Sequence, residues 1–387
     1  MTHPRRPAPT VLHPPASLGV IGGGQLGRMF VQAAQRMGYR AGVLGEIAGG
    51  PGPQVAQWSV IGPPDHLPAL RSFAAQAVAA TVEFENVSAP ALRWLARRMV
   101  VRPGWRTVRV AQDRLREKSF LARHGLPLAP WRPVRTEAEL LGAVRDLGTP
   151  LILKTAASGY DGKGQVRVDE PDQAPSAWVQ LGRVACVAEG WVTFASEASI
   201  VVARGADGEA ATYPVALNHH ERHILDSTLM PAPVGPIVAQ EARALALAVA
   251  QALGTVGVLT VEFFLTAEGH LLINELAPRP HNSGHLTIEA AVSGQFEQQV
   301  RALCGLPLGG TGLVSPAAMA NLLGDLWRDG EPDWGRMARL DPGVKLHLYG
   351  KKTPAPGRKM GHLTVLDPDR DVALARVLAA RRALNRR

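Results

Sequence analysis

Three oxygen-bearing side chains occupy what the sequence predicts to be a single hairpin. Glu262 lies in an apolar run from Val258 to Leu265, and Asn274-Glu275 follows a turn at Ala267-Glu268-Gly269. Strands joined by a short turn lie side by side, so the two carboxylates should meet. Carboxylate and amide oxygens suit Mg²⁺, which commonly bridges nucleotide phosphates. The hairpin therefore predicts a magnesium site on Glu262 and Glu275, with two exposed acids as the alternative.

A second segment has the composition of a phosphate-binding loop. Lys154 lies near the end of an apolar run from Leu151 to Thr155, and Gly159-Tyr-Asp-Gly-Lys-Gly-Gln165 follows. Glycines let backbone N–H groups approach phosphate oxygens, the lysines supply charge, and such a loop can close to exclude water. The Gly-Lys-Ser/Thr ending of a Walker A motif is missing. We therefore expect a different polyphosphate site, with a flexible turn as the alternative.

Polar donors are dense between Ala277 and His285, where two prolines stiffen a loop. Arg279 could grip a carboxylate or a phosphate at two points. The other polar groups of the loop could orient bicarbonate or an amine, although His285 could equally be a structural hydrogen-bonding residue; these groups are His281, Asn282, Ser283 and His285. Near the C-terminus, Tyr349-Gly-Lys351 and Arg358-Lys359-Met-Gly-His362 add cations for a phosphorylated substrate, unless they only decorate the surface.

A glycine-rich turn opens the chain's first helical pattern. Gly22, Gly24 and Gly27 form a G-x-G-x-x-G set after an apolar strand. Glu46 lies close to the distance expected of a ribose-binding acid. Three interpretations stay open: a site for NAD or FAD, a site for another anionic ligand at a helix N-terminus, or a tight strand-to-helix turn.

These groups need elements to hold them, and the first part of the chain has the pattern of an α/β layer. The strand that begins at Leu18 enters the glycine turn, and apolar residues recur at helical spacing from Gln25 to Met37. Further strands are predicted at Arg40–Leu44 and Ala80–Phe84, with a proline-rich loop from Ile61 to Pro68. We therefore predict a parallel-sheet domain over residues 1–112.

The composition changes near residue 112. Gln112 to His124 predicts a charged helix, and the irregular alternation that follows suits an α+β domain over residues 113–312. Residues 313–387 look β-rich and end in a helix of Ala and Arg. Besides those already mentioned, strands are predicted at Cys186–Glu189, Ala198–Ala203, Ala211–Val215, Lys345–Tyr349 and Gly361–Leu366.

Composition and charge exclude several classes of protein. A chain of 387 residues with 46% hydrophobic and 19% charged side chains should form two or three well-packed domains. Its charge of +9 is scattered and only 5% of residues are aromatic, so no nucleic-acid partner is expected. The uncharged run from Ala244 to Val261 predicts a helix and a strand, not a membrane span. Two isolated cysteines and a tail without a signal-peptide core predict a reduced, cytoplasmic protein.

Taken together, the motifs resemble those of the 5-(carboxyamino)imidazole ribonucleotide synthase family, ATP-grasp enzymes of purine biosynthesis. The resemblance covers roughly residues 18–366. GYDGKGQ and APRPHNSGH are specific to that family, whereas the paired acids are shared by ATP-grasp proteins generally. The motifs that carry it are GGGQLGRM, Gln112-Asp-Arg114 with Glu117-Lys118, GYDGKGQ, Glu262 with Asn274-Glu275, APRPHNSGH, YGK and RKMGH.

The resemblance implies a Rossmann-like pre-ATP-grasp domain, an ATP-grasp domain with a mobile lid at about 120–192, and a small β-rich C-terminal domain. It implies that MgATP phosphorylates bicarbonate to carboxyphosphate, which carboxylates the amine of aminoimidazole ribonucleotide and leaves ADP and phosphate. The implied metal ligands are Glu262 and Glu275. The implied ATP-binding residues are Arg114, Lys154, Gly159, Tyr160, Asp161, Gly162, Lys163, Gly164, Gln165, Glu189, Gly190, Trp191, Val192, Glu197, His220, Asn274 and Glu275. The implied substrate-facing or catalytic residues are Gly24, Gln25, Leu26, Glu83, Tyr160, Asp161, Arg279, His281, Asn282, Lys351, Arg358 and Lys359.

Two segments depart from the family pattern. Leu217-Asn218 stands where Glu-Asn is expected, which leaves open whether His219 or His220 faces ATP, and Ser293-Gly294-Gln295 replaces Thr-Ser-Gln. The resemblance also implies a homodimer whose product passes to a separate mutase. Three other functions stay open: another ATP-grasp ligase, such as a formate-using glycinamide ribonucleotide transformylase, a dinucleotide-dependent oxidoreductase, and a non-catalytic nucleotide-binding regulator.

Overall fold

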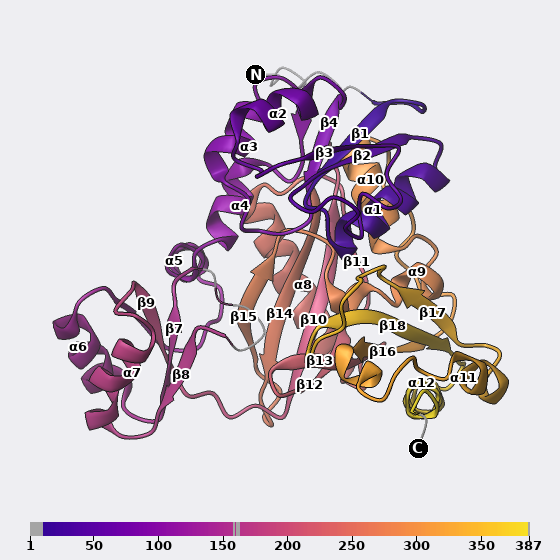
Figure 1. The fold of residues 1–387 in the computed structure, drawn as a ribbon. Helices are drawn as coiled ribbons and strands as arrows, with labels where there is room; N and C mark the ends of the chain where they lie inside the picture. The colour runs from indigo at the N-terminus through magenta and orange to yellow at the C-terminus, as the bar shows by residue number, and fades with distance from the viewer. Residues whose placement is uncertain (1–10, 158, 160–162, 386–387) are drawn as a thin grey trace, which may run out of the picture.

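A computed structural model describes residues 11–157, 159 and 163–385 of the chain. It contains three sheets (Figure 1). A parallel sheet of N-terminal residues lies at the top of the view, and a small antiparallel sheet lies at the lower left. A nine-stranded antiparallel sheet, here called the central sheet, fills the middle and right. The elements of each sheet determine which side chains can meet.

The N-terminal sheet is parallel throughout, as the sequence predicts, with strand order β3-β2-β1-β4-β5. Its central strands are buried on both faces, which is why they read as continuous apolar runs. The predicted loop from Ile61 to Pro68 ends early, because α2 begins at Leu67 and accommodates Pro68 in its first turn. The strands are β1 Ser17–Ile21, β2 Arg40–Gly45, β3 Trp58–Ile61, β4 Ala79–Val82 and β5 Val100–Val101; the helices are α1 Gln25–Arg36, α2 Leu67–Ala74, α3 Ala89–Leu95 and α4 Trp105–Ala111.

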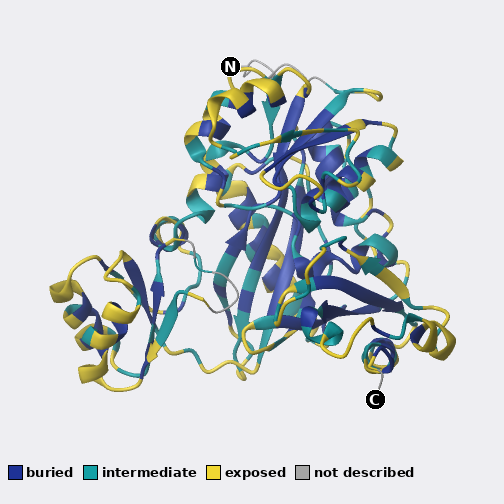
Figure 2. Ribbon diagram, viewed as in Figure 1, coloured by how far each residue is buried: buried dark blue, intermediate teal, exposed yellow. Residues whose placement is uncertain are grey.

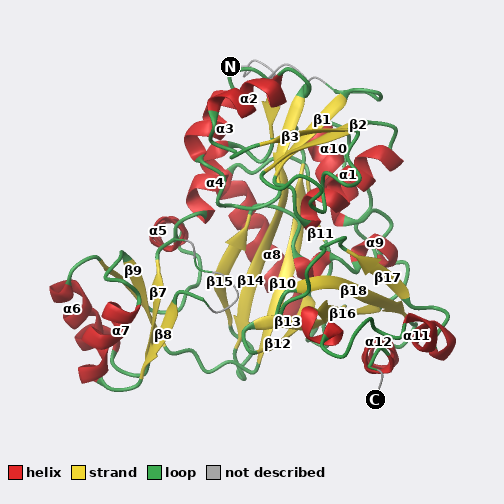
Figure 3. Ribbon diagram, viewed as in Figure 1, coloured by secondary structure: helices red, strands yellow, loops and turns green. Residues whose placement is uncertain are grey.

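The four-stranded sheet, here called the lid sheet, has the order β6-β9-β7-β8. Two helices cover the face turned away from the central sheet (Figure 3), and they pack on it through Leu140, Val144 and Trp178. Helix α5, Arg114–Arg123, precedes the lid sheet and lies between it and the central sheet. The lid elements are β6 Trp131–Val134, α6 Glu137–Leu147, β7 Leu151–Thr155, β8 Gln165–Val168, η1 Pro171–Gln173, α7 Ala174–Gln180 and β9 Cys186–Gly190.

The central sheet runs β15-β14-β10-β12-β13-β16-β18-β17, with β11 beside β10. The predicted strand at Ala211–Val215 ends sooner, at Thr212, and the hairpin of β12 and β13 was not predicted. The strands are β10 Ser196–Arg204, β11 Ala210–Thr212, β12 Ala216–Glu221, β13 Ile224–Met230, β14 Gly257–Leu265, β15 Leu271–Ala277, β16 Ala317–Leu323, β17 Lys345–Leu348 and β18 Lys359–Leu366. The helical elements are α8 Pro236–Leu253, η2 Asn282–Gly284, α9 Thr287–Ala290, α10 Gln295–Cys304, η3 Gly324–Trp327, α11 Trp334–Leu340 and α12 Arg370–Ala383.

The uncharged run from Ala244 to Val261 divides between α8 and β14, as predicted, and Gly254 ends the helix in a left-handed conformation. Among the described residues, no helix combines the length and apolarity needed to cross a membrane. Helix α8 packs against buried faces of β10, β14 and β15 (Figure 2). This packing explains the apolar character of the run.

Segments distant in sequence complete one another's cores. Phe296, Val300 and Leu303 of α10 pack with Val20 and Met29 of the N-terminal layer. The β-rich C-terminal segment joins the central sheet because β16 pairs with β13. The division at residues 112 and 312 therefore stays a prediction about domains, while the hydrogen-bonded sheet continues across residue 312.

Candidate active site

The two predicted metal ligands lie directly opposite each other on neighbouring strands. Glu262 of β14 pairs with Glu275 of β15, and the register then shifts so that Phe263 pairs with Ile273. Asn274 is the extra residue of this bulge, a feature that commonly re-aims side chains beside active sites. Its Oδ1 is buried with no hydrogen-bond partner in the described part of the chain. The hairpin thus collects two carboxylates and an unused amide oxygen, as its sequence predicts.

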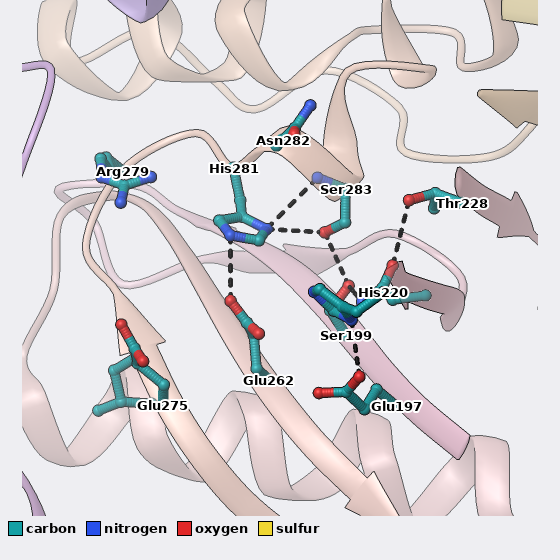
Figure 4. Close-up of polar contacts among 12 residues, drawn as sticks. Glu197, Ser199, His220, Thr228, Glu262, Glu275, Arg279, His281, Asn282 and Ser283 are labelled. Atoms are coloured by element: carbon teal, nitrogen blue, oxygen red, sulfur yellow. Dashed lines mark hydrogen bonds and ion pairs between the residues drawn. The ribbon is translucent and has the colours of Figure 1, made fainter. Parts of the chain in front are cut away.

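Each carboxylate already contacts a nitrogen donor. The Nε2 atom of His281 lies 3.0 Å from Glu262 Oε1 (Figure 4). Arg114 lies 3.0 Å from Glu275 Oε2. Burial alone would raise the pKa of Glu262, but the neighbouring His281 outweighs it and holds that pKa well below its usual range. Glu262 is therefore ionised at neutral pH, as a metal ligand must be.

The loop after β15 brings further groups to the same place. Arg279 Nε donates to Glu85 Oε2 at 2.7 Å. Burial opposes ionisation of Glu85, but Arg279 outweighs it and lowers the pKa of that carboxyl. The side chain of Asn282 is directed away from Glu262 (Figure 4) and exchanges hydrogen bonds of 3.1 and 2.8 Å with Asn321. The loop therefore presents Arg279 and His281, whereas the Asn282 amide is engaged elsewhere.

A buried ionic cluster joins the lid sheet, α5 and the central sheet. Lys154 Nζ lies 3.0 Å from Glu189 Oε2, and Lys118 Nζ lies 3.3 Å from Glu189 Oε1. Burial raises the pKa of Glu189, but the two lysines outweigh it and the pKa falls to about 2. Lys118 also donates to the Asn274 carbonyl at 3.4 Å. The fully buried Lys118 thus connects β9 of the lid sheet with β15.

The structure distinguishes the two candidate histidines. His220 Nδ1 lies 2.7 Å from Glu197 Oε2, whereas the His219 side chain is 65% exposed and approaches Glu221. Burial lowers the pKa of His220, but the hydrogen bond and charge of Glu197 outweigh it and raise the pKa above its ordinary value. Leu217, which stands where a Glu was expected, packs among apolar side chains. His220 is therefore the histidine that accompanies Glu197 at the site.

The glycine turn encloses a carboxylate of its own layer. The backbone N–H groups of Gly24 and Leu26 donate to Glu83 at 2.5 and 3.1 Å. A Cβ at Gly24 would lie 2.2 Å from Glu83 Oε1, so a larger residue there would displace that carboxylate. Burial raises the pKa of Glu83, and these hydrogen bonds partly offset it. Gln25 begins α1 directly behind this turn.

The remaining predicted residues are less closely gathered. Lys351 donates to the Lys359 carbonyl at 2.5 Å, while the exposed Arg358 donates to Thr353 O at 2.7 Å. Trp191 is exposed under the Arg167 guanidinium. Lys154 pairs with Gln165 across β7 and β8. Tyr160, Asp161 and Gly162 lie outside the described residues, and the other predicted positions around them are Gly159, Lys163, Gly164, Gly190 and Val192.

Comparisons with known sequences match three consecutive families. They are the ribonucleotide synthetase preATP-grasp domain over residues 16–112, the ATP-grasp domain over 119–296, and the phosphoribosylaminoimidazole carboxylase C-terminal domain over 317–376. N5-carboxyaminoimidazole ribonucleotide synthase of Bacillus subtilis is 42% identical over 361 residues, which are 93% of this chain and 94% of the relative. The chain belongs to the N5-carboxyaminoimidazole ribonucleotide synthase family.

Solved structures of this family share the whole fold. N5-carboxyaminoimidazole synthetase of Staphylococcus aureus complexed with ADP has a TM-score of 0.90 and 35% identity, covering 97% of this chain and 99% of that one. The synthase of Aspergillus clavatus in complex with ADP and 5-aminoimidazole ribonucleotide has a TM-score of 0.86 and 31% identity, covering 95% and 98%. The predicted family and fold class are confirmed, and the oxidoreductase interpretation of Gly22 to Gly27 is set aside.

Several site residues of this family member were missed by sequence reasoning. Lys118 and Glu117 were quoted only as part of a motif, although both are buried and contact β15. Burial, followed by the charge of Glu275, raises the pKa of Glu117 to about 8. Their signal was the spacing of Arg114, Glu117, Lys118 and Leu121, which places charged groups on the inner stripe of α5. Glu85 gave no comparable signal.

Proposed function

We propose that the protein carboxylates 5-aminoimidazole ribonucleotide with bicarbonate at the expense of ATP, giving N5-carboxyaminoimidazole ribonucleotide, ADP and phosphate. The observation that carries the proposal is the Glu262–Glu275 pair, which adjoins both the Arg279–His281 loop and the ionic cluster of Lys154 and Glu189. A nucleotide-activating site and an anion-binding loop thus meet at one hairpin. Family members that bind ADP and the ribonucleotide support the same reading.

ATP binding is assigned to the residues that lie between the lid sheet and the central sheet. Lys154 and Arg114 supply fixed positive charge there, and the glycine loop between β7 and β8 supplies backbone donors for the phosphates. Glu197 and His220 form a hydrogen-bonded pair on adjacent strands, suited to hydroxyl groups of a ribose. The further ATP contacts proposed are those of the glycine loop from 159 to 165, residues 189–192 and Asn274.

Mg²⁺ fits the hairpin. Glu262 and Glu275 offer two carboxylates in register, and Asn274 offers a buried amide oxygen without a partner among the described residues. Such oxygens are the ligands that this ion prefers. When bound, the ion neutralises phosphate charge as the γ-phosphoryl group leaves ADP. Arg114 and His281 hold the two carboxylates in place beside it.

The chain's own residues then have to protect a short-lived acyl phosphate. Bicarbonate oxygen attacks the γ-phosphorus of ATP to give carboxyphosphate, and the ribonucleotide amine attacks its carbonyl carbon and expels phosphate. Arg279 and His281 supply donors for the developing negative charge, and a closing lid excludes water. The further substrate contacts proposed are Gly24, Gln25, Leu26, Glu83, Tyr160, Asp161, Asn282, Lys351, Arg358 and Lys359.

The deciding experiment is ADP release by the purified protein with MgATP and bicarbonate, with and without 5-aminoimidazole ribonucleotide. We expect release to rise sharply with the ribonucleotide and to depend on bicarbonate. Release that ignores both compounds would overturn the assignment. Formate with glycinamide ribonucleotide is the matched substrate control, because it tests the rival ATP-grasp ligase.

Four further assignments belong to this proposal. The protein acts in the cytoplasm, forms a homodimer and releases its product to a separate mutase. Buried, unpaired Cys186 and Cys304 are compatible with a reducing compartment. The domain limits proposed are 1–112, 113–312 and 313–387, with a lid at about 120–192. Sedimentation equilibrium tests the dimer, for which a species of twice 41.2 kDa is expected.

A further inference from the structure

An open groove lies outside the site described above. It has a volume of about 980 Å³ and is bordered by α4, by α5 and by two loops of the lid sheet, one before α6 and one before β9. Helices α4 and α5 lie between the parallel sheet and the lid sheet (Figure 1). None of the residues that line the groove is among those assigned to ATP, magnesium or the ribonucleotide. Any ligand of this groove would therefore occupy a second site.

The groove is strongly basic. Five of the twelve residues that line it are arginines, whereas one is acidic. The arginines come from three parts of the chain, and all five side chains are exposed. An anion held among them is attracted by every one of these charges, and binding it relieves their mutual repulsion. The five are Arg106 and Arg109 of α4, Arg116 and Arg123 of α5, and Arg135 between β6 and α6.

Nearby carboxylates do little to neutralise these arginines. Asp113 Oδ1 accepts from the Arg116 backbone N–H at 3.0 Å and so caps α5, while its Oδ2 lies 3.8 Å from Arg116 Nε. Arg135 approaches Glu139 at 3.9 Å, which is also long for an ion pair. Within the described part of the chain, no carboxylate forms an ion pair with the other three guanidinium groups, those of Arg106, Arg109 and Arg123. The groove therefore keeps most of its positive charge.

Apolar groups lie between the charges. Leu115 is buried, and Val110 and Trp105 are partly buried along the same groove. The Arg106 guanidinium lies 5.3 Å from the centroid of the Trp105 ring, a cation–π contact that holds the charge at the edge of the groove. Small-molecule sites commonly have volumes of about 300–1,000 Å³ and combine apolar walls with a few polar groups that orient the ligand. The groove has the size and lining of such a site.

We propose that this groove binds a small anion that carries two or more phosphate groups. A guanidinium group is planar and matches two phosphate oxygens at once, and the groove gathers five of them around a volume too large for a single phosphate ion. A nucleotide and an inorganic oligophosphate share this chemistry. An acidic protein segment fits less well, because the charges come from three elements around one volume and do not follow a single helix or strand.

The test counts bound ligand by equilibrium dialysis of the full chain, without magnesium and without other substrates. Inorganic tripolyphosphate is the first probe and ADP is the second. Arg109→Gln/Arg116→Gln removes two of the five charges and keeps residues that favour a helix. At the same free concentration, we expect the unaltered protein to bind one more tripolyphosphate per chain than this variant. Its dissociation constant for that additional molecule should be about 10- to 100-fold lower than in the variant, because two charge-assisted contacts are lost.

A second pair of substitutions tests whether one ligand spans the groove. Arg123→Gln/Arg135→Gln removes one charge from α5 and one from the lid sheet's loop, and it should lose the same single molecule of tripolyphosphate. This variant also serves if the first one does not fold, which circular dichroism checks. The matched control is Arg40→Gln/Arg243→Gln, which removes the same charge at two exposed positions of β2 and α8 and should bind as the unaltered protein does.

The two probes also identify the source of the phosphate groups. An additional ADP that both groove variants lose supports a nucleotide, and an additional tripolyphosphate alone supports an inorganic oligophosphate. Unchanged binding of both probes in the groove variants, or an equal loss in the control, would overturn the proposal. So would a ten-residue glutamate peptide that binds through these arginines while neither phosphate probe does. Binding is counted without turnover, so the result is independent of whether the protein responds to the ribonucleotide.

Discussion

At the scale of single residues, each proposed metal ligand contacts a side chain that carries a nitrogen donor. Glu275 contacts Arg114 at 3.0 Å and keeps 38% of its side chain exposed, while Glu262 contacts His281. The negative charge of Glu275 has the largest effect on Arg114, and it raises the pKa of the guanidinium. Arg114 and His281 therefore orient the two carboxylates, while Glu275 stays partly exposed.

Glu275→Gln should reduce magnesium-dependent ADP release by roughly 100-fold or more, because the variant loses a charged ligand while keeping the side chain's shape. Steady-state rates over a range of Mg²⁺ concentrations measure the effect, and circular dichroism checks the fold. Glu268→Gln, in the turn of the same hairpin, is the control and should be silent. Near-normal turnover in Glu275→Gln would refute the metal assignment.

Lys351→Ala should raise the KM for the ribonucleotide about 10-fold and leave the KM for ATP nearly unchanged, because a lost contact to a substrate phosphate weakens binding of that substrate alone. Initial rates at varied concentrations of each substrate separate the two constants. Its exposed neighbour provides the comparison, since Lys352→Ala removes the same charge one residue away. Equal increases in the KM for the ribonucleotide in both variants would mean that Lys351 acts through its charge at a distance and not through a direct contact.

At the scale of elements, α5 connects parts of the molecule that the proposed function requires to work together. Arg114 contacts Glu275, Glu117 accepts from the Leu276 N–H at 3.1 Å, and Lys118 reaches both the Asn274 carbonyl and Glu189 of β9. These contacts lie on one stripe of the helix. The opposite side of α5, with Arg116 and Arg123, lines an open groove of about 980 Å³ together with Arg109 of α4.

Glu189→Gln should lower the free energy of unfolding by about 3–5 kcal/mol at pH 7, because it leaves two buried lysines without their anion. The folded-state pKa of about 2 lies below the ordinary value of 4.5, so this stabilisation is present above pH 4.5 and is lost as the pH falls toward 2. Urea unfolding of Glu189→Gln and of the unaltered protein, measured from pH 7 to pH 3, should show the difference between their free energies of unfolding becoming smaller.

The exposed Glu209→Gln is the control for that series and should follow the unaltered protein at every pH. If the difference in free energy of unfolding between Glu189→Gln and the unaltered protein does not change with pH, the charge of Glu189 is not what stabilises the cluster.

The elements themselves were largely predictable where periodicity was strong. The hairpin of β14 and β15, the strand carrying Lys154 and the parallel N-terminal sheet all follow from apolar patterns. The hairpin of β12 and β13 was missed because Asn218, Asp226 and Thr228 interrupt its apolar pattern with buried polar groups that find their partners only in the folded protein. The same reason hides Ser199, since a serine's partners are not encoded in its neighbours.

At the scale of the whole molecule, the central sheet joins strands from both sides of residue 312. Strand β13 pairs with β16 from Ser227 to Met230, and Leu229 packs in one core with Ala318 and Leu363. The proposed C-terminal domain is therefore hydrogen-bonded to the ATP-grasp strands along a shared edge.

A chain that ends at residue 312 should be largely insoluble, because it exposes β13 as an unpaired edge beside uncovered apolar residues. Soluble yield and gel filtration measure this. The control is the full chain with a protease site between residues 308 and 312, which after cleavage should elute as one folded particle. A monodisperse, folded truncated protein would show that the sheet is stable without its last three strands.

The pairing of β13 with β16 also has a consequence for biosynthesis. Translation delivers β13 long before β16, and the N-terminal layer likewise waits for α10 to cover it. A nascent chain on the ribosome must therefore hold an incomplete central sheet and an uncovered N-terminal layer until late in synthesis. Chaperone protection during synthesis is expected to matter more here than in a protein whose domains fold one after another.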